Sequence, residues 1–238
     1  MTYTALHTRA QRDWLGLAHS PMPLIQIGTG TCGIASGADK VMESVRKTLK
    51  DIQVTARIME VGCIGLCYLE PLMTIRTEDC PPIIYGSLNS TIAAEIISRY
   101  LIDGDLCLEW SICTLGEESI EDIPRLEDHP MMRNQRRIAL RNCGLIDPAN
   151  ISHYIARGGY EGLNRALRMS GAEVAEMISR AGLRGRGGAG FPTGLKWELT
   201  RKQQAKDKYI VCNADEGDPG AFMDRALLEG DPHSVVEG

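Results

Sequence analysis

The sequence contains no hydrophobic run long enough to cross a bilayer and no excess of positive charge. Its net charge is -5, with 26 Lys and Arg against 31 Asp and Glu, so no overall basic field attracts it to nucleic acid. The first 18 residues also lack the apolar core of a secretion signal. With 43% hydrophobic and 24% charged residues over 238 positions, we expect a folded cytoplasmic protein of one large or two ordinary domains.

Disulfide bonds are the next feature that we do not expect, although the chain has eight cysteines. A cytoplasmic chain of this length does not carry a disulfide framework, so the thiols are either buried small side chains or metal ligands. Cys63 and Cys67 form the one closely spaced pair, in a segment whose two glycines permit the tight backbone that converging thiolates require. Cys107 and Cys113 lie in no glycine-rich loop, and we expect neither to bind metal.

The first part of the chain, residues 24–103, has the pattern of a compact α/β unit. The predicted elements are a strand at 24–27, a helix at 38–50, strands at 52–59, 72–76 and 83–85, and a helix at 92–102. Apolar residues recur every four positions in both helices, which marks one buried face on each. Two helices beside a small mixed sheet predict a thioredoxin-like layout. In that layout Cys32 follows the first strand and Cys63 and Cys67 follow the second, so all three meet at one end of the sheet.

Two cysteine-containing segments carry a family resemblance. Residues 28–38 (GTGTCGIASGA) and 63–67 (CIGLC) resemble the thioredoxin-like ferredoxin domain that is fused to NADH-oxidising flavoprotein subunits of soluble hydrogenases and formate dehydrogenases. The resemblance implies a [2Fe–2S] cluster that takes two thiolates from each segment. Cys32, Cys63 and Cys67 occupy three of these four positions.

The fourth position departs from the family, because Gly37 stands about where the second cysteine of the first segment belongs. Three alternatives remain at this point. The neighbouring Ser36 supplies an oxygen ligand, or Cys80 supplies a thiolate from a separate connection before two prolines. In the third alternative the domain has lost its cluster and serves as a docking module.

Charge and proline mark a boundary after this unit. Acidic residues, then arginines, with two prolines among them, fill residues 104–135 and predict a solvated linker. We therefore expect a ferredoxin-like domain at 1–103, this linker, and the first part of a second α/β domain at 136–238. That domain begins with helical signals, since Asp147 followed by a proline predicts a helix that ends at Gly158.

The most informative motif is the run 182–197 (GLRGRGGAGFPTGLKW), with six glycines, three cations and two aromatic residues. Glycine lets the backbone approach a ligand closely, and successive exposed N–H groups can hold a phosphate. Arg184, Arg186 and Lys196 supply positive charge, and either aromatic ring can stack on a flat group. The run therefore predicts a loop for a flat, phosphorylated ligand.

Part of this run, residues 185–190, also matches the dinucleotide-binding pattern G-x-G-x-x-G, which requires a strand immediately before it. Here Ser170 and Glu173 predict a capping box that opens a helix, and this helix leads directly into the loop. The secondary structure of residues 173–181 therefore decides between this interpretation and an ordinary Rossmann dehydrogenase.

The segment beyond the glycine-rich run complements its charge. Residues 208–213 predict a short buried strand, whose end presents the polar or acidic residues Asn213, Asp215, Glu216 and Asp218. Their oxygens can accept hydrogen bonds from sugar hydroxyls but repel phosphate. We expect the positive loop and this negative segment to face one ligand.

The second half of the chain has a more specific resemblance. Residues 137–144 (RIALRNCG), 182–197 and 209–225 (YIVCNADEGDPGAFMDR) are similar to the NADH-binding flavoprotein subunit of respiratory complex I and its soluble relatives. The cofactor-binding residues that the resemblance implies are Gly185, Arg186, Gly187, Gly188, Phe191, Lys196, Asn213, Asp215, Glu216 and Asp218.

The same resemblance implies a role for each group of residues. Residues 187–188 with Lys196 hold the phosphate and ribityl chain of FMN, and residues 213–215 bond the flavin. Residues 216–218 line the nucleotide pocket for NAD(H), and Phe191 stacks on a nicotinamide or adenine ring.

The activity implied is that of an NADH dehydrogenase of the diaphorase type, in which FMN takes a hydride and releases single electrons to iron–sulfur centres. No acid–base catalytic residue is expected. The implied partners are subunits of a hydrogenase, a formate dehydrogenase or a complex I-like assembly.

The family's subunit continues with a second glycine-rich segment and a C-terminal [4Fe–4S] domain, so the resemblance implies a fragment with substoichiometric flavin. The alternative is a non-enzymatic ferredoxin-like relay or docking subunit.

Overall fold

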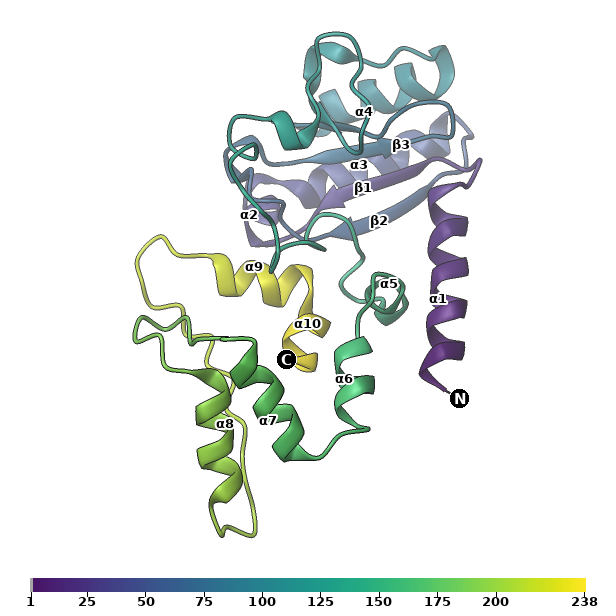
Figure 1. Cartoon of the computed structure of the whole chain (residues 1–238). Coiled ribbons are helices and arrows are strands. Elements are labelled where there is room, and N and C mark those ends of the chain that lie inside the picture. The colour runs from purple at the N-terminus through teal and green to yellow at the C-terminus, as the bar shows by residue number, and fades with distance from the viewer. Residues whose placement is uncertain (1) are drawn as a thin grey trace. The chain divides into compact units, whose positions relative to one another are not determined.

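The computed structural model describes residues 2–238, and the chain divides into two compact units (Figure 1). The first unit comprises the residues up to 158 together with 216–236 and 238, and the second comprises 159–215 and 237. Within residues 2–238, no helix combines the length and the apolar character needed to cross a membrane.

A five-stranded sheet forms the centre of the first unit (Figure 1). Its strands are β1 (Leu24–Gly28), β2 (Arg57–Val61), β3 (Met73–Arg76), β4 (Ile83–Tyr85) and β5 (Ser111–Thr114). They lie in the order β2-β1-β3-β4-β5, with β1 and β2 parallel and every other pair antiparallel. A parallel first pair followed by an antiparallel hairpin is the predicted thioredoxin-like layout, which is confirmed.

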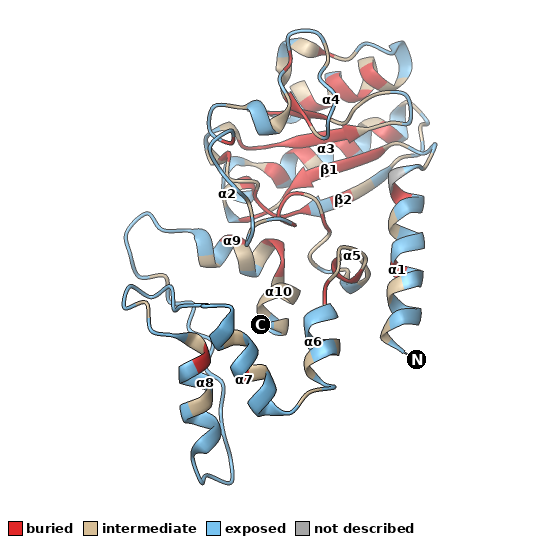
Figure 2. Ribbon diagram, viewed as in Figure 1, coloured by how far each residue is buried: buried red, intermediate tan, exposed pale blue. Residues whose placement is uncertain are grey.

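Two helices cover one face of this sheet, α3 (Ala38–Asp51) and α4 (Ser90–Ser98), the latter continued by a π-helical turn η2 (Arg99–Asp103). The predicted four-residue repeat is their buried stripe, for example Val41 and Val45 packed with Ile25 and Ile27 of β1. Figure 2 shows these helices and strands as the most buried part of the chain. The sheet and its two helices therefore form the main core of the first unit.

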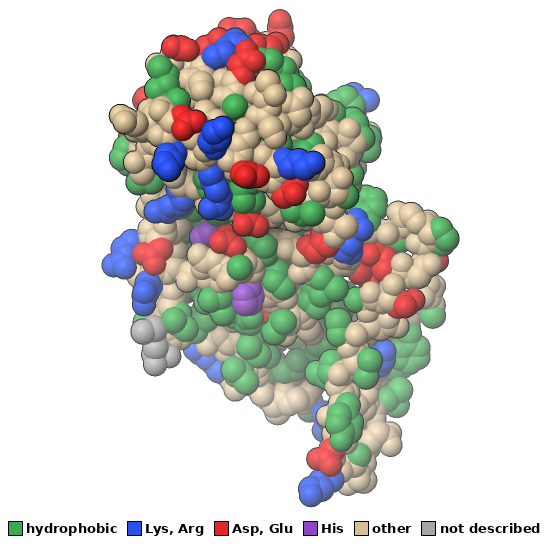
Figure 3. Space-filling view, turned by 180° about the vertical axis from the view of Figure 1, so that it is seen from behind, with side chains coloured by type: hydrophobic (Ala, Val, Ile, Leu, Met, Phe, Trp, Pro, Cys, Tyr) green, Lys and Arg blue, Asp and Glu red, His purple; other side chains and the backbone are tan. Residues whose placement is uncertain are grey.

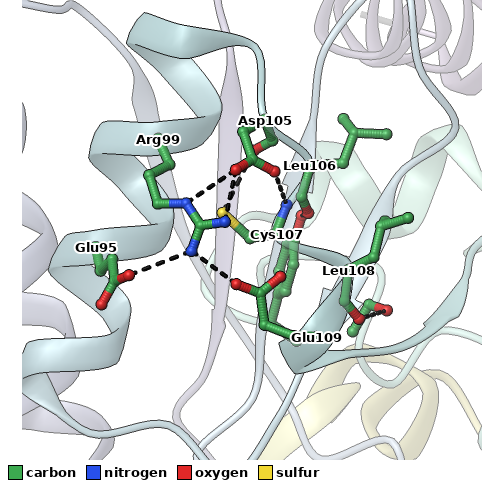
Figure 4. Close-up of polar contacts among 9 residues, drawn as sticks. Glu95, Arg99, Asp105, Leu106, Cys107, Leu108 and Glu109 are labelled. Atoms are coloured by element: carbon green, nitrogen blue, oxygen red, sulfur yellow. Dashed lines mark hydrogen bonds and ion pairs between the residues drawn. The ribbon is translucent and has the colours of Figure 1, made fainter.

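The predicted linker, residues 104–135, contributes the fifth strand of the sheet. Arg99 at the end of α4 contacts three carboxylates, those of Asp105 at 2.5 Å, Glu109 at 2.6 Å and Glu95 at 3.2 Å (Figure 4). These contacts hold the chain before β5 against the end of α4. One of the acidic residues that predicted a solvated linker, Glu109, thus helps to fix the start of this segment to the domain.

Two cysteines of this segment are buried in apolar surroundings. Cys107 belongs to the main core, and Cys113 of β5 packs with Leu66, Leu72 and Ile84 on the other face of the sheet. Burial raises the pKa of Cys107 to about 11 and that of Cys113 to about 12. Both cysteines are therefore core residues.

The remaining helices of the first unit are α1 (Tyr3–Ala18), α2 (Thr31–Ser36), α5 (Ile151–Ala156), α9 (Met223–Gly230) and α10 (Pro232–Glu237), with 3-10 turns η1 (Cys67–Leu69), η3 (Leu108–Trp110) and η4 (Leu126–Asp128). The predicted start of a helix at Asp147 is wrong. Asp147 instead closes a turn by accepting a hydrogen bond from the N–H of Ala149, and Asn150 caps α5 by accepting one from Ser152.

The second unit is built around a pair of helices, α7 (Gly171–Arg180) and α8 (Thr193–Lys202), preceded by α6 (Glu161–Ala166). The predicted capping box at Ser170 and Glu173 is present and opens α7. Because a helix precedes the glycine-rich run, the Rossmann interpretation is excluded. The strand predicted at 208–213 is also wrong, since this segment is irregular and exposed and pairs with no described strand.

Gly194 sets how closely α7 and α8 approach each other. A Cβ atom at this position would overlap Ser179 and lie 2.8 Å from the carbonyl oxygen of Ala175, both on α7. We predict that Gly194→Ala lowers the free energy of unfolding of this helix pair by about 1–3 kcal/mol. The measurement is chemical denaturation followed by circular dichroism.

Gly171→Ala is the matched control, because a Cβ there meets only the flexible side chain of Arg201 at 3.7 Å. This variant should unfold within about 0.5 kcal/mol of the parent. Equal stability of both variants would contradict the close helix packing.

His153 couples the stability of the first unit to pH. Its ring packs edge-on against Trp14 of α1, and its Nδ1 accepts a hydrogen bond from the N–H of Asp147. Burial lowers the pKa of His153, so below about pH 6.5 the unfolded chain binds a proton that the folded chain resists. Stability should therefore fall as the pH is lowered from about 7.5 to about 5.5.

The measurement is the free energy of unfolding in urea at both pH values for the parent and His153→Asn. The Asn side chain retains an acceptor oxygen but does not titrate. We expect a smaller loss at low pH in the variant, and an identical loss in both proteins would rule out this role for His153.

Candidate functional site: a cysteine cluster and a glycine-rich loop

Three cysteines converge where the two parallel strands end. Cys32 lies in the first turn of α2, directly after β1, and Cys63 and Cys67 lie in the loop after β2. Because Gly28 pairs with Val61 in the register of β1 and β2, both strands deliver their following loops to the same edge. The three sulfur atoms lie within 4.8 Å of one another, and those of Cys63 and Cys67 are 3.5 Å apart. The predicted convergence is confirmed.

In the absence of a bound cation, the surroundings of Cys32 and Cys67 disfavour the negatively charged thiolate form of these side chains. Hydrogen bonding to the Cys63 sulfur, together with burial, raises the pKa of Cys32 well above its usual range. Burial likewise raises the pKa of Cys67. A bound metal reverses this preference, because a coordinating thiol loses its proton. The three thiols therefore suit a cationic centre better than free ionised cysteines.

Glycines allow tight packing of the backbone around the three cysteines. A Cβ at Gly33, next to Cys32, would overlap the carbonyl oxygen of Gly28 at the end of β1. A Cβ at Gly62, next to Cys63, would overlap Gly230 at the end of α9. Gly65, between the two later cysteines, has a φ of +96°. The predicted tight backbone around converging thiolates is thus present, and the donor set fits an iron–sulfur group.

Sequence analysis missed one residue of this site, Glu70. It follows the turn η1, and its Oε1 lies 3.7 Å from the Sγ of Cys32. Its side chain is only 8% exposed, and burial raises its pKa to about 7. The available signal was its position three residues after Cys67, within the same tight loop.

Cys80, one of the predicted alternatives for a fourth ligand, lies at the wrong end of the sheet. It belongs to the connection between β3 and β4, which leaves β3 at Arg76, paired with Leu24 at the start of β1. The cysteine cluster lies beyond the opposite end of β1. Cys80 is therefore excluded as a ligand.

Helix α9 of the first unit packs against the cysteine loops. The Glu229 carboxylate accepts hydrogen bonds from the N–H of Thr31, at 2.9 Å, and from its hydroxyl. A negative charge is favourable there, at the N-terminus of the helix that carries Cys32. Gly230 at the end of α9 packs on Gly62 and the sulfur of Cys143. Residues 223–230 thus contact both cysteine-bearing segments.

In the second unit, the glycine-rich run forms a closed loop between α7 and α8. The N–H of Gly185 donates to the carbonyl of Phe191 at 2.8 Å, and Arg184 Nε donates to the carbonyl of Gly190 at 2.6 Å. Arg184, which was expected to supply free charge, is therefore part of the loop's own structure. Gly188 and Gly190 have φ values of +97° and +61°, which glycine adopts readily.

The side chains predicted to bind a ligand in this loop are available to one. A Cβ at Gly187 or Gly188 would meet nothing within 4 Å, so the backbone there faces open space. Arg186 and Lys196 are exposed and form no ion pair among residues 2–238. The ring of Phe191 is 46% exposed. An open, cationic backbone loop can receive a phosphorylated ligand.

The predicted acidic residues lie in two different units. Asn213 and Asp215 are exposed in the second unit, where the Oδ1 of Asn213 accepts a hydrogen bond from the N–H of Asp215. Glu216 and Asp218 belong to the first unit. Glu216 accepts hydrogen bonds from the N–H groups of Asp224 and Arg225 and so caps α9. The roles of all ten predicted cofactor-binding residues stay predictions.

Comparison with protein families identifies residues 178–238 as a match to the Nuo51 FMN-binding domain. The NADP-reducing hydrogenase subunit HndC of Solidesulfovibrio fructosivorans is 65% identical over 105 residues, which are 44% of this chain and 21% of that protein. An NADH-quinone oxidoreductase subunit of Escherichia coli is 47% identical over 93 residues, 38% of this chain and 21% of that protein. These findings confirm the predicted resemblance.

Two solved structures are similar at low sequence identity. The thioredoxin-like [2Fe–2S] ferredoxin from Aquifex aeolicus has 16% identity and a TM-score of 0.35, over 40% of this chain and all of that one. An NAD+-reducing [NiFe]-hydrogenase has 20% identity and a TM-score of 0.35, over 94% of this chain and 36% of that one. The chain spans about a fifth of the length of the curated relatives named above.

The site geometry predicts that Gly33→Ala disrupts the cysteine cluster. The added methyl group must displace either the end of β1 or the turn that carries Cys32. After anaerobic treatment with iron and sulfide, the variant should retain at most about a tenth of the parent's iron. Ala35→Ser, an exposed change on the same helix, is the control and should match the parent. Full iron content in Gly33→Ala would contradict the proposed packing.

Proposed function

We propose that this chain belongs to an electron-transfer flavoprotein module that oxidises NADH through FMN and passes electrons to iron–sulfur centres. The observation that carries the proposal is the match of residues 178–238 to an FMN-binding domain family. The matched residues begin in α7 and include the whole open glycine-rich loop. The same chain brings three thiols together in its other unit. A flavin site and a metal centre in one chain are the parts that such a module requires.

FMN, when bound, accepts a hydride from NADH and releases the electrons one at a time. The residues of the chain itself bind FMN and the nucleotide and orient them for this transfer. The backbone N–H groups of residues 187–188 and the ammonium of Lys196 hold the phosphate, while residues 213–215 hold polar atoms of the flavin. Residues 216–218 line the nucleotide side, and Phe191 offers a ring for stacking. No proton transfer by a side chain is needed for hydride transfer.

The second cofactor in the proposal is a [2Fe–2S] cluster. Cys32 holds it from the loop after β1, and Cys63 and Cys67 hold it from the loop after β2. Thiolates from two loops are the usual protein ligands of such a cluster. The support is the convergence of the three sulfur atoms at one partly buried edge of the sheet.

Partners and location form part of the proposal. We infer that the module works with further subunits of a hydrogenase, a formate dehydrogenase or a complex I-like assembly, in the cytoplasm. Hydrophobic side chains reach the surface in several places on the face shown in Figure 3. In the second unit, Leu167 is 77% exposed and Ile210 fully exposed. In the proposal, a partner subunit covers exposed apolar side chains of this kind.

We retain the division into a ferredoxin-like domain at 1–103, a connecting segment at 104–135 and an FMN-binding part at 136–238 as a proposal. A second candidate function is a ferredoxin-like relay or docking subunit that binds no flavin. One observation favours it: three thiols of the cluster are already brought together, whereas residues 208–213 of the flavin half are irregular and exposed. Flavin binding separates the two functions.

FMN binding is tested by titrating the anaerobic chain into FMN and following the quenching of flavin fluorescence. Gly187→Val should keep the fold, because a Cβ there meets nothing within 4 Å, but should weaken binding at least about 10-fold by occupying the phosphate position. Lys196→Ala should weaken binding by a similar factor through loss of charge. Lys202→Ala, at the far end of α8, is the matched control and should bind like the parent.

NADH added to the FMN-loaded chain without oxygen should bleach the flavin absorption. A parent chain that quenches no flavin fluorescence supports the relay function instead. Unchanged binding by both Gly187→Val and Lys196→Ala would place the flavin elsewhere in the chain.

A further inference from the structure

The [2Fe–2S] cluster of the proposed function lacks one ligand, since three thiols converge in the part of the chain that the structure describes. We propose that the carboxylate of Glu70 is the fourth protein ligand. This inference rests on the proposed cluster and adds a residue that the family's cysteine pattern does not contain. It is supported by the position, burial and contacts of Glu70.

Glu70 turns its side chain into the protein, toward Cys32. It follows η1, three residues after Cys67, and is only 8% exposed. One carboxylate oxygen, Oε2, accepts a hydrogen bond from the N–H of Leu72 at 2.8 Å. The other, Oε1, lies 3.7 Å from the Sγ of Cys32. The backbone hydrogen bond to Oε2 thus orients the carboxylate, and Oε1 faces the cysteine cluster.

No cationic side chain among residues 2–238 forms an ion pair with this carboxylate. Eleven ion pairs are present in that range, and none includes Glu70. A buried carboxylate is costly unless it is paired with a cation or coordinates a metal. The three thiols beside it are groups that bind a cation. A metal centre held by them would supply the missing positive charge.

Two of the donor distances suit pairs of ligands that share one metal ion. Two ligands bound at about 2.0–2.3 Å to one tetrahedral ion lie roughly 3.3–3.8 Å apart. The sulfurs of Cys63 and Cys67 are 3.5 Å apart, and the Cys32 sulfur and Glu70 Oε1 are 3.7 Å apart. A [2Fe–2S] cluster takes two protein ligands on each iron, and ligands other than cysteine occur in such clusters. One pair therefore serves each iron.

Two glycines leave the space between Glu70 and Cys32 clear. A Cβ at Gly28 would lie 3.1 Å and 3.2 Å from the two carboxylate oxygens. A Cβ at Gly33 would lie 3.3 Å from Oε2, besides overlapping the end of β1. The backbone around the cluster thus accommodates the carboxylate at this position.

The two alternative fourth ligands that the sequence suggested, Ser36 and Cys80, fit the structure less well. Ser36 is exposed at the end of α2 and makes no hydrogen bond to the three thiols in the part of the chain described. Cys80 lies beyond the other end of the sheet. Glu70 is the oxygen donor that already contacts a member of the triad.

The test compares the full chain with Glu70→Gln and Glu70→Cys after anaerobic reconstitution with iron and sulfide. Iron and sulfide per chain, visible absorption and the rate of iron loss to a chelator are measured. Glu70→Gln preserves the size of the side chain and an acceptor for the Leu72 N–H but removes the anionic ligand. We expect it to lose iron at least about 10-fold faster than the parent.

Glu70→Cys supplies a thiolate at the same position. We expect it to hold the cluster at least as firmly as the parent, with visible bands shifted because a fourth thiolate has replaced an oxygen ligand. Glu78→Gln, at an exposed site in the connection that contains Cys80, and Cys80→Ser are the controls. Both should keep the iron content and spectrum of the parent. Far-ultraviolet circular dichroism of every variant verifies that the fold is intact.

Two results would overturn the inference in distinguishable ways. If Glu70→Gln keeps the parent's spectrum and rate of iron loss, and Glu70→Cys leaves the spectrum unchanged, Glu70 is not a ligand while the cluster stands. If the parent itself takes up no iron and sulfide, the chain does not form the proposed cluster, and the proposal of a fourth ligand is then also wrong.

Discussion

The parallel pairing of β1 with β2 is the constraint on which the site depends. Two parallel strands end at the same edge of a sheet, so the loops that follow them meet, even though the strands are far apart in the chain. Here the pair Gly28 and Val61 closes the register, and the next residues on each side lead to Cys32 and Cys63. A shift of this register by one residue would turn alternate side chains to the opposite face and separate the thiols.

Electrostatics explains why this edge suits a metal centre. Buried and half-buried thiols lie beside a buried carboxylate, an arrangement that is unfavourable for charged groups in the absence of a cation. The half-buried Arg137 is near Cys143 and Cys63, and its partial burial lowers the pKa of its guanidinium. Glu229 meanwhile neutralises the positive end of α2. Through α9, part of the segment that matches the FMN-binding family contacts the cysteine loops.

Sequence periodicity predicted the fold best where one helix face is buried. The four-residue repeat in α3 and α4 and the capping box at Ser170 are local patterns with a direct physical cause, and both are present in the structure. The strand at 208–213 failed because a strand needs a pairing partner, which its own apolar residues do not reveal. The segment 104–135 was predicted from its charge as a linker, but three carboxylates around one arginine instead fix the approach to β5 (Figure 4).

The cysteine triad could be predicted because its members follow predicted strands, but Glu70 could not. An acidic residue in a loop is usually exposed, and only the folded chain shows that this one is buried beside Cys32.

The most direct measurement is a crystal structure of the reconstituted chain with anomalous diffraction at the iron absorption edge. The account predicts two adjacent iron peaks between the loops that follow β1 and β2, one beside Cys32 and the other beside Cys63 and Cys67. Iron bound elsewhere, or none at this edge, would contradict it.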